Sequence, residues 1–408
     1  MNFKTHFNGF KCFRCGAVQG RDFQGYVCPA CGGNLEVVYE WPRVRPVPDW
    51  WKEVARRNVF RYAALMPVSR LDLVPPLRVG LTPLIDAPRL GKLAGLKNLR
   101  IKDDGQNPTA SLKDRASAMA VAKAMEAGYT KIACSSTGNA ASSLAGNAAA
   151  AGLQSVIFVP ERAPLGKVSQ LLIFGAKVIS VQGTYEDTFE MSKAAIERYG
   201  WYNRNAAINP YLMEGKKTVA LEIAEQLGWT APDYVALSVG DGCTIAGVWK
   251  GFKDLYAAGF IDRLPRLISV QAEHTCPINR AVETGEPWSP MEEDTLADSI
   301  SVGVPRNADK AIAAIRESRG LTAEVSDEEI LAAMRYLGKT CGVFGEPAGV
   351  TGTAGLGKLC RAGAIPADAT VVTIVTGNGL KDTANAVKAA GEPIKMKPDV
   401  RRLAEIFE

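Results

Sequence analysis

Between residues 98 and 375, short apolar runs alternate with longer stretches rich in alanine and other small residues. The apolar runs have the length of β-strands, and the stretches between them have the length and spacing of helices, for example from Ser111 and from Asn139. Repeated strand and helix units predict an α/β fold with parallel sheets covered by helices. The predicted strands are 98–102, 131–135, 155–160, 177–182, 234–239, 267–272 and 370–375.

The N-terminal segment follows a different pattern. It carries two Cys-x-x-Cys pairs, Cys12 with Cys15 and Cys28 with Cys31, with twelve residues between the pairs. Four thiolates at this spacing are typical of a zinc ribbon, in which the metal stabilises a segment too short to form its own core. Because four protein ligands leave no open position for water, the Zn²⁺ is expected to be structural.

Composition narrows the class of protein only in part. The chain has 408 residues, 47% of them hydrophobic, and a formal charge of +5 without a long basic run, so we expect a large core and no nucleic-acid binding. The N-terminus has no signal-peptide pattern, and no window has the roughly 18 to 20 apolar residues of a membrane span. A cytoplasmic enzyme without membrane contact is therefore expected.

Four loops that directly follow predicted strands carry the candidate chemistry, because ligands of open parallel sheets bind at the carboxyl ends of the strands. Lys113 lies in the first turn of a predicted helix, where the helix dipole favours the free amine that imine formation needs. The loop 135–140 combines hydroxyls with a helix start and suits an anion, and the loop 240–244 could hold a phosphate. The fourth loop is 376–382. Taken singly, each feature is also compatible with a surface lysine or a plain turn.

Together and in this order, the four loops resemble those of threonine synthase and its relatives, the fold-type-II enzymes that use pyridoxal 5′-phosphate (PLP) and share the fold of the tryptophan synthase β-subunit. The resemblance covers residues 80–390. The motifs that carry it are Gly80-Leu-Thr-Pro-Leu, Asn107-Pro-Thr-Ala-Ser-Leu-Lys-Asp-Arg, Ser135-Ser-Thr-Gly-Asn, Glu214-Gly-Lys-Lys-Thr, Trp249-Lys-Gly-Phe, Glu346-Pro-Ala and Thr376-Gly-Asn-Gly-Leu-Lys-Asp.

The resemblance implies a role for each matched residue. Lys113 would bind the cofactor as an imine and then move protons as general base and acid. Asn139 would hydrogen-bond the cofactor's 3′-oxygen and lie beside the substrate, and Thr376 would meet the pyridine nitrogen. Ser136 and Thr137 would hold the substrate carboxylate. The cofactor phosphate would be bound by the loop made of Gly240, Asp241, Gly242, Cys243 and Thr244.

The sequence departs from the family where the family binds the distal phosphate of O-phosphohomoserine. Ala140 stands where the family usually has Thr, Ala207 where it has Ser, Leu212 where it has Arg, and Asp241 where it has Asn. A desolvated phosphate would lose charge-assisted hydrogen bonds worth roughly 1.5 to 3 kcal/mol each. Either the substrate is different, or a charge comes from another position, for which Arg204, Lys216 and Lys217 are the candidates.

We therefore predict PLP-dependent elimination or replacement on a small L-amino acid, with threonine formation from O-phosphohomoserine and water as the family reaction. A threonine or serine ammonia-lyase is the alternative, and a non-catalytic zinc-ribbon binding protein is a further one. The resemblance also implies a homodimer. The predicted domains are a zinc ribbon (1–40), a connecting arm (41–79) with a helix near Trp50 to Asn58, a large PLP-binding lobe (80–109 and 216–390), a small inserted lobe (110–215) and a tail (391–408).

Overall fold

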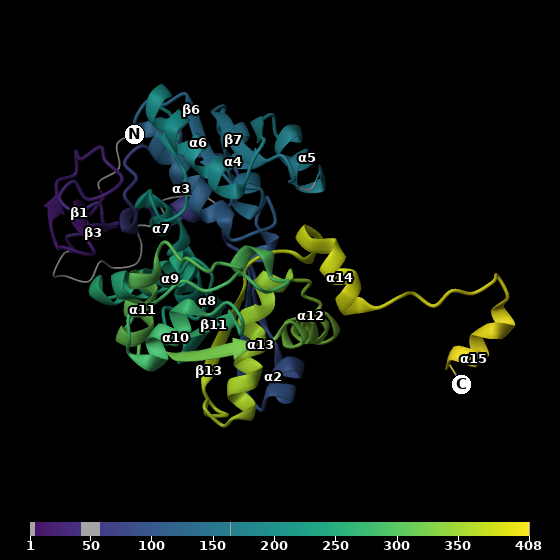
Figure 1. The fold of residues 1–408 in the computed structure, drawn as a ribbon. Coiled ribbons are helices and arrows are strands. Elements are labelled where there is room, and N and C mark those ends of the chain that lie inside the picture. Colours follow the sequence, from purple (N-terminus) through teal and green to yellow (C-terminus); the bar gives the residue numbers. More distant parts are fainter. Residues whose placement is uncertain (1–4, 42–57, 164, 408) are drawn as a thin grey trace.

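The computed structural model describes residues 5–41, 58–163 and 165–407 (Figure 1). Two α/β lobes, each built on its own sheet, form the body of the molecule, and a small three-stranded sheet lies beside them. The two parallel-rich sheets confirm the predicted fold class. The helix expected near Trp50 to Asn58 falls outside the described residues, except for Asn58 itself.

The large lobe is built on a six-stranded sheet with the order β12-β11-β10-β13-β5-β4, in which only the edge strand β4 runs antiparallel to its neighbour. Alternate residues of β10 enter opposite cores, Val235 and Leu237 one and Tyr234 and Ala236 the other. The strands are β4 (Leu84–Asp86), β5 (Asn98–Asp103), β10 (Tyr234–Ser238), β11 (Arg266–Ala272), β12 (Leu321–Val325) and β13 (Thr370–Val375).

Helices cover both faces of this sheet, which explains why its central strands are almost continuously apolar. One core is shared with α8 (Thr218–Gln226), α9 (Cys243–Ala257), α10 (Pro277–Thr284) and α11 (Ala308–Glu317). The other core is shared with α2 (Pro88–Ala94), α12 (Asp327–Cys341), α13 (Pro347–Arg361) and α14 (Thr383–Ala390). Short 3₁₀ turns η3 (Asp104–Gln106), η4 (Asp298–Ile300) and η5 (Gly379–Asp382) lie in its loops.

The small lobe has a four-stranded parallel sheet with the order β8-β7-β6-β9. Its central helices are rich in alanine, so that α3 and α4 approach each other and the sheet closely in one core. The elements are α3 (Lys113–Glu126), β6 (Lys131–Ser135), α4 (Asn139–Ala151), β7 (Gln154–Pro160), α5 (Leu165–Ile173), β8 (Lys177–Val181), α6 (Tyr185–Tyr199), β9 (Tyr202–Asn203) and α7 (Tyr211–Lys216).

Residues 58–79 pack against the large lobe. The 3₁₀ helix η1 (Val59–Leu65) places Phe60 and Tyr62 in the core that also contains α8 and α9. The Tyr62 hydroxyl donates a hydrogen bond to Glu225. The short turn η2 (Leu71–Leu73) follows. This part of the expected arm therefore contributes to the core of the body.

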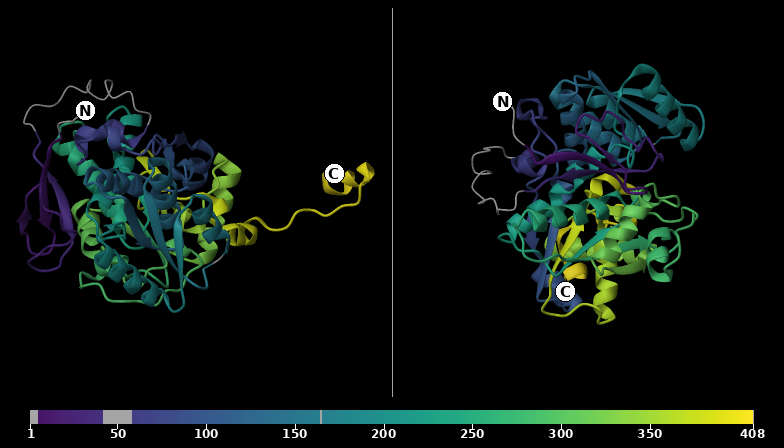
Figure 2. Two further views of the ribbon diagram at one scale, coloured as in Figure 1. Left: turned by 90° about the horizontal axis from the view of Figure 1, so that it is seen from above. Right: turned by 90° about the vertical axis from the view of Figure 1, so that its left-hand side faces the viewer.

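The N-terminal sheet lies against one side of the body, the side that faces the viewer in the right view of Figure 2. It consists of β1 (Phe7–Cys12), β2 (Val18–Gln19) and β3 (Leu35–Tyr39), all antiparallel. The Tyr26 hydroxyl accepts a hydrogen bond from the Asn203 backbone in the small lobe at 3.1 Å, while the Lys310 ammonium of the large lobe donates to the Leu35 carbonyl at 2.8 Å. The sheet thus contacts both lobes.

The C-terminal residues extend away from the body in both Figure 1 and the left view of Figure 2. They end in the 3₁₀ turn η6 (Val400–Leu403) and the short helix α15 (Ala404–Phe407). No helix in the described ranges combines the length and the apolar character that crossing a bilayer requires.

Candidate active site

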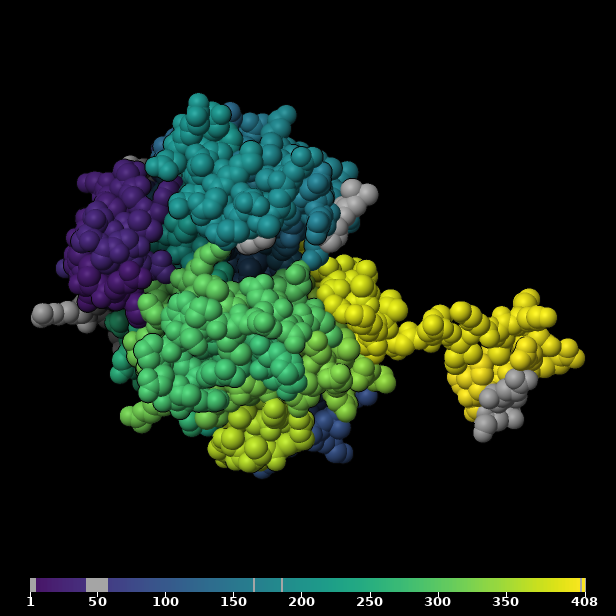
Figure 3. Space-filling view, in the orientation of Figure 1, coloured from purple at the N-terminus to yellow at the C-terminus, as the bar shows by residue number. Residues whose placement is uncertain are grey.

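The residues predicted to bind the cofactor meet between the two lobes. The loops that follow β5, β6, β10 and β13 open toward the gap, which appears as a hollow in Figure 3. A cavity of about 90 Å³ is lined by Lys113, Asn139, Thr376 and the loop 240–244. A wider cavity of about 450 Å³ shares Asn139 and Glu346 with it. The structure therefore brings Lys113, Asn139, Thr376 and the loop 240–244 to one cavity.

Lys113 is the first residue of α3, whose start is held by the large lobe. The Leu112 N–H donates to the Thr376 carbonyl at 2.8 Å, and Ser111 pairs with Gly377, so the helix begins two residues later than predicted. Within the described residues the Lys113 ammonium has no hydrogen bond or ion pair. Burial, followed by the positive charge of Lys216, lowers the pKa of Lys113 to about 8. About a tenth of the side chain is then the free, nucleophilic amine at pH 7, against less than about a thousandth for an ordinary lysine.

The loop 240–244 forms an anion cradle at the N-terminus of α9. Gly242 has a φ of 82°, and a Cβ there would lie 2.7 Å from the Cβ of Ala311. A Cβ at Gly240 would lie 2.8 Å from the Cα of Ile300. Both positions therefore require glycine, and the residues at the start of α9 line the cavity, where a helix N-terminus suits a phosphate.

Asp241 is turned toward a neighbouring loop. Its carboxylate accepts a hydrogen bond from the Arg306 backbone at 3.1 Å, and its carbonyl accepts one from the Asn307 backbone at the same distance. The carboxylate thus helps to fix the loop that leads into α11. Asp241, which stands where the family has Asn, is therefore engaged by backbone N–H groups of this loop.

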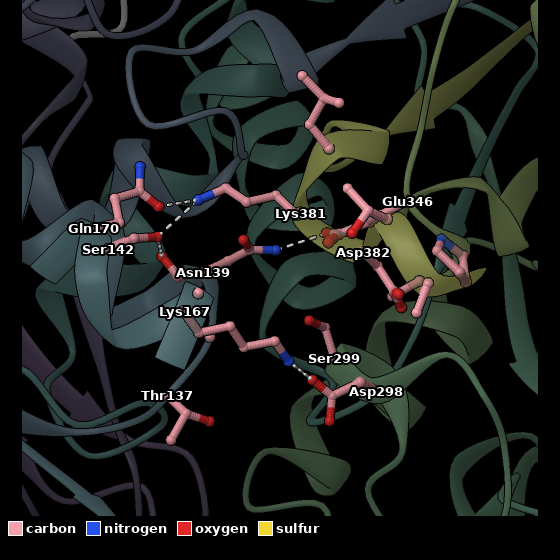
Figure 4. A pocket seen from close by; sticks show the side chains of 17 residues that line it. Thr137, Asn139, Ser142, Lys167, Gln170, Asp298, Ser299, Glu346, Lys381 and Asp382 are labelled. Atoms are coloured by element: carbon pink, nitrogen blue, oxygen red, sulfur yellow. Dashed lines mark hydrogen bonds and ion pairs between the residues drawn. The ribbon is translucent and has the colours of Figure 1, made fainter. Parts of the chain in front are cut away.

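Glu346 is a site residue to which the sequence assigned no role. It precedes α13, and its carboxylate accepts a hydrogen bond from the Asn139 amide at 2.6 Å across the cleft (Figure 4). Burial raises the pKa of Glu346 to about 7, although the Asn139 hydrogen bond opposes this shift. The only feature of the sequence that pointed to Glu346 as a site residue was its place in the motif Glu346-Pro-Ala, before a helix.

Only some of the residues predicted to contact the substrate line the cavities. Thr137 lines the wider cavity, and the Ser136 hydroxyl accepts a hydrogen bond from the Gly138 N–H at 3.3 Å. Leu212 is buried in the small-lobe core and lines neither cavity. Ala140 and Ala207 also lie outside both linings, and Ala207 adopts a left-handed φ of 62°. Such a conformation is uncommon for alanine.

Polar contacts join the lobes at the mouth of the wider cavity (Figure 4). Lys381, which follows β13, donates to the Ser142 hydroxyl at 3.0 Å and to the Gln170 amide oxygen at 2.9 Å. Lys167 on α5 forms an ion pair of 2.6 Å with Asp298 on η4. Opening the lobes would break these contacts.

The four ribbon cysteines lie close to one another at the tip of the N-terminal sheet. Their sulfur atoms are all within 4.8 Å of one another, with Cys12 to Cys31 at 3.5 Å and Cys15 to Cys28 at 3.7 Å. A tetrahedron with Zn–S bonds of about 2.3 Å has S–S edges of about 3.8 Å. The thiols therefore fit a tetrahedral metal site.

Comparison with known proteins tests this interpretation. The family model "Pyridoxal-phosphate dependent enzyme" matches residues 76–377. The threonine synthase of Methanosarcina acetivorans is 40% identical over 398 residues, which is 97% of this chain and 97% of that protein. The threonine synthase of a Synechocystis strain is 43% identical over 349 residues, covering 84% and 88%. This chain belongs to the threonine synthase family.

Membership of the threonine synthase family confirms two predictions: that the protein is a PLP-dependent lyase, and that its function is like that of threonine synthase. Solved structures agree on the fold. A tomato threonine deaminase superposes with a TM-score of 0.65 at 20% identity, covering 81% of this chain and 92% of that chain. Maize serine racemase superposes with a TM-score of 0.64 at 23% identity, covering 73% and 88%. The fold is therefore that of the fold-type-II enzymes.

Proposed function

We propose that this protein catalyses PLP-dependent elimination or replacement on a small L-amino acid, with threonine formation from O-phosphohomoserine and water as the reaction of its named relatives. The observation that carries the proposal is the cavity in which an unpaired Lys113 faces the cradle 240–244 and Thr376. The lowered pKa of that lysine and the glycine-lined helix start fit the aldehyde and the phosphate of the cofactor.

Each residue would perform a limited task. Bound PLP supplies the electron sink that stabilises negative charge at the substrate Cα. The Lys113 amine would hold the cofactor and then remove and return protons at the substrate carbon atoms. Asn139, fixed by Glu346, would orient the cofactor ring, and Thr376 would offer a neutral hydroxyl to the ring nitrogen. The N–H groups at the start of α4, with Thr137, would bind the substrate carboxylate.

A second candidate is a threonine or serine ammonia-lyase. This alternative is favoured by Leu212. The family usually has an arginine at this position that would contact the distal phosphate, whereas Leu212 is apolar and buried in the small-lobe core. Ala140 and Ala207 likewise offer no side-chain donors. An ammonia-lyase needs no distal phosphate site, so these residues are compatible with it.

The visible absorption of the cofactor-loaded protein, titrated with O-phosphohomoserine, threonine and serine in turn, separates the two. Released phosphate and 2-oxo acid are assayed in parallel. We expect a response and phosphate release with O-phosphohomoserine. A response to threonine or serine with 2-oxo acid, and none to O-phosphohomoserine, would establish the ammonia-lyase. Silence toward all three would contradict both.

We also propose that Cys12, Cys15, Cys28 and Cys31 bind one structural Zn²⁺, which the near-tetrahedral spacing of their sulfur atoms supports. Metal analysis should give one zinc per chain, and the double variant Cys12→Ser/Cys15→Ser should lose it. Since the ribbon contacts both lobes, that variant should fold in lower yield, while the surviving protein retains its chemistry. A full zinc content in the variant would refute the assignment. The homodimer and the cytoplasmic location remain predictions.

A further inference from the structure

Two buried cations near Lys113 have no acidic partner among the described residues. Lys216, at the end of α7, is 4% exposed and lines the smaller cavity. Its ammonium forms no hydrogen bond or ion pair within the described ranges. Lys113 lines the same cavity of about 90 Å³, so two lysines without an acidic partner among the described residues share it.

Arg204, which follows β9, is 2% exposed. Its Nε and Nη2 both donate to one hydroxyl, that of Ser117, at 3.2 Å. A guanidinium has five N–H donors, so most of its capacity is unused by the described residues. Ser117 lies one turn after Lys113 on α3, so Arg204 approaches the same end of that helix, although it lines neither cavity.

Most other buried cations in the described part of the chain are paired; the exception is Lys310, which donates to the Leu35 carbonyl at 2.8 Å but forms no ion pair there. Arg115 binds Asp104 at 2.6 Å and Glu222 at 2.7 Å, and Lys217 binds Asp254 at 2.7 Å. Lys217 is thereby excluded as a source of charge for a ligand. A buried charge without a partner is strongly unfavourable, so Arg204 and Lys216 indicate an anion that completes the site.

The positions of these cations relate them to the missing family donors. Lys216 lies one helical turn after Leu212 on α7, since the two are four residues apart. Arg204 precedes Ala207 by three residues, and Ala206 between them lines the same cavity as Lys216. Each cation is therefore close in sequence to a missing family donor: Arg204 to Ala207, where the family has a Ser hydroxyl, and Lys216 to Leu212, where it has an Arg guanidinium.

We propose that Lys216 and Arg204 form a relocated anion site for the distal group of the substrate. The substrate is then a small L-amino acid whose side chain carries a phosphate or a similar oxyanion. This inference rests on the proposed function and decides between its two candidates. The other source of the same chemistry is the cofactor phosphate, but the cradle 240–244 already offers that group glycine-lined backbone donors.

The test uses Lys216→Met in the full-length protein, with Lys253→Met, an exposed lysine on α9, as the matched control. Calorimetry measures the binding of inorganic phosphate to the cofactor-loaded proteins. A separate titration of the cofactor-free proteins with PLP measures cofactor affinity. We expect Lys216→Met to weaken phosphate binding roughly 10- to 100-fold and to leave PLP affinity within about twofold. The control should match the wild type.

Arg204→Met and Arg204→Lys give a second readout, because the lysine retains the charge if the methionine variant folds poorly. Arg204→Lys should bind phosphate more tightly than Arg204→Met. The inference is wrong if the loaded wild type does not bind phosphate, if Lys216→Met binds it equally well, or if that variant loses PLP affinity instead. Phosphate binding without any reaction of amino acids would leave this site intact and refute the proposed function.

Discussion

The two halves of the cleft differ in the kind of atom that they present. Around the cradle 240–244, the donors are backbone N–H groups at a helix start, in a conformation that Gly240 and Gly242 fix. Along residues 204–216, the recognition that we propose depends on side chains, and there Ala207 and Leu212 stand where the family usually has Ser and Arg. Backbone donors persist when neighbouring side chains change, whereas side-chain donors are lost with one substitution. The same fold can therefore retain its cofactor while its substrate contacts are rearranged.

Substituting Lys113, the central residue of the cofactor half of the cleft, should have the largest effect on activity. Lys113→Ala deletes the amine that we assign to cofactor attachment and proton transfer, so activity should fall by about 10²- to 10⁴-fold or more. Borohydride reduction followed by peptide mass spectrometry should find the cofactor on Lys113 in the wild type and on no lysine in the variant.

Lys123→Ala is the matched control, because Lys123 lies on the same helix but pairs with Glu126 away from the cavity. It should retain the bound cofactor and the activity of the wild type. Cofactor attached elsewhere in Lys113→Ala would overturn the assignment of Lys113.

Glu346, which links the two halves through Asn139, should give a pH-dependent effect on stability. The pKa of Glu346 is about 7 in the folded protein, against 4.5 for an ordinary glutamate. Between pH 4.5 and about pH 7, the folded protein therefore retains a proton on Glu346 that the unfolded chain loses. Stability should therefore fall as pH rises, by about 3 kcal/mol in all for this group. Glu346→Gln removes this contribution.

Urea denaturation of the cofactor-free wild type and Glu346→Gln, from about pH 5 to about pH 8, measures the difference. The stability of the wild type relative to the variant should decline across this interval, since all other titrating groups are common to both. Parallel curves would show that Glu346 ionises normally, and its proposed role in holding Asn139 would lose its electrostatic support.

Features that a short stretch of sequence determines were predicted, and the others were not. The strands 131–135 and 370–375 were predicted to the residue, because strands buried on both faces are mostly apolar over a short run. The short edge strand β4 and the half-buried β12 were not among the predicted strands, since neither shows such a run. Lys113, Asn139 and Thr376 were placed together because each follows a parallel strand.

The contacts that the sequence did not reveal join residues far apart in the chain. Asn139 and Glu346 are separated by 207 positions, and local spacing carries no information about such a pair. Arg204 and Lys216 were candidates for a distal charge, but only the structure shows that Lys217 is paired and that these two form no ion pair with any residue it describes. Burial and pairing are properties of the packed state, so a sequence pattern can suggest them only indirectly.

The contact between Lys167 and Asp298 should have the smallest effect. Their side chains are 33% and 67% exposed, and an exposed ion pair contributes at most about 1 kcal/mol. Lys167→Ala should change stability by less than that, and should raise KM by no more than about fivefold without changing kcat, because the pair holds the lobes together without contacting the reacting atoms. The difference from the wild type should vanish at about 1 M salt, where charges are screened within about 3 Å. A larger, salt-insensitive rise in KM would instead mean that Lys167 binds the substrate directly, and the substrate half of the cleft would then extend to α5.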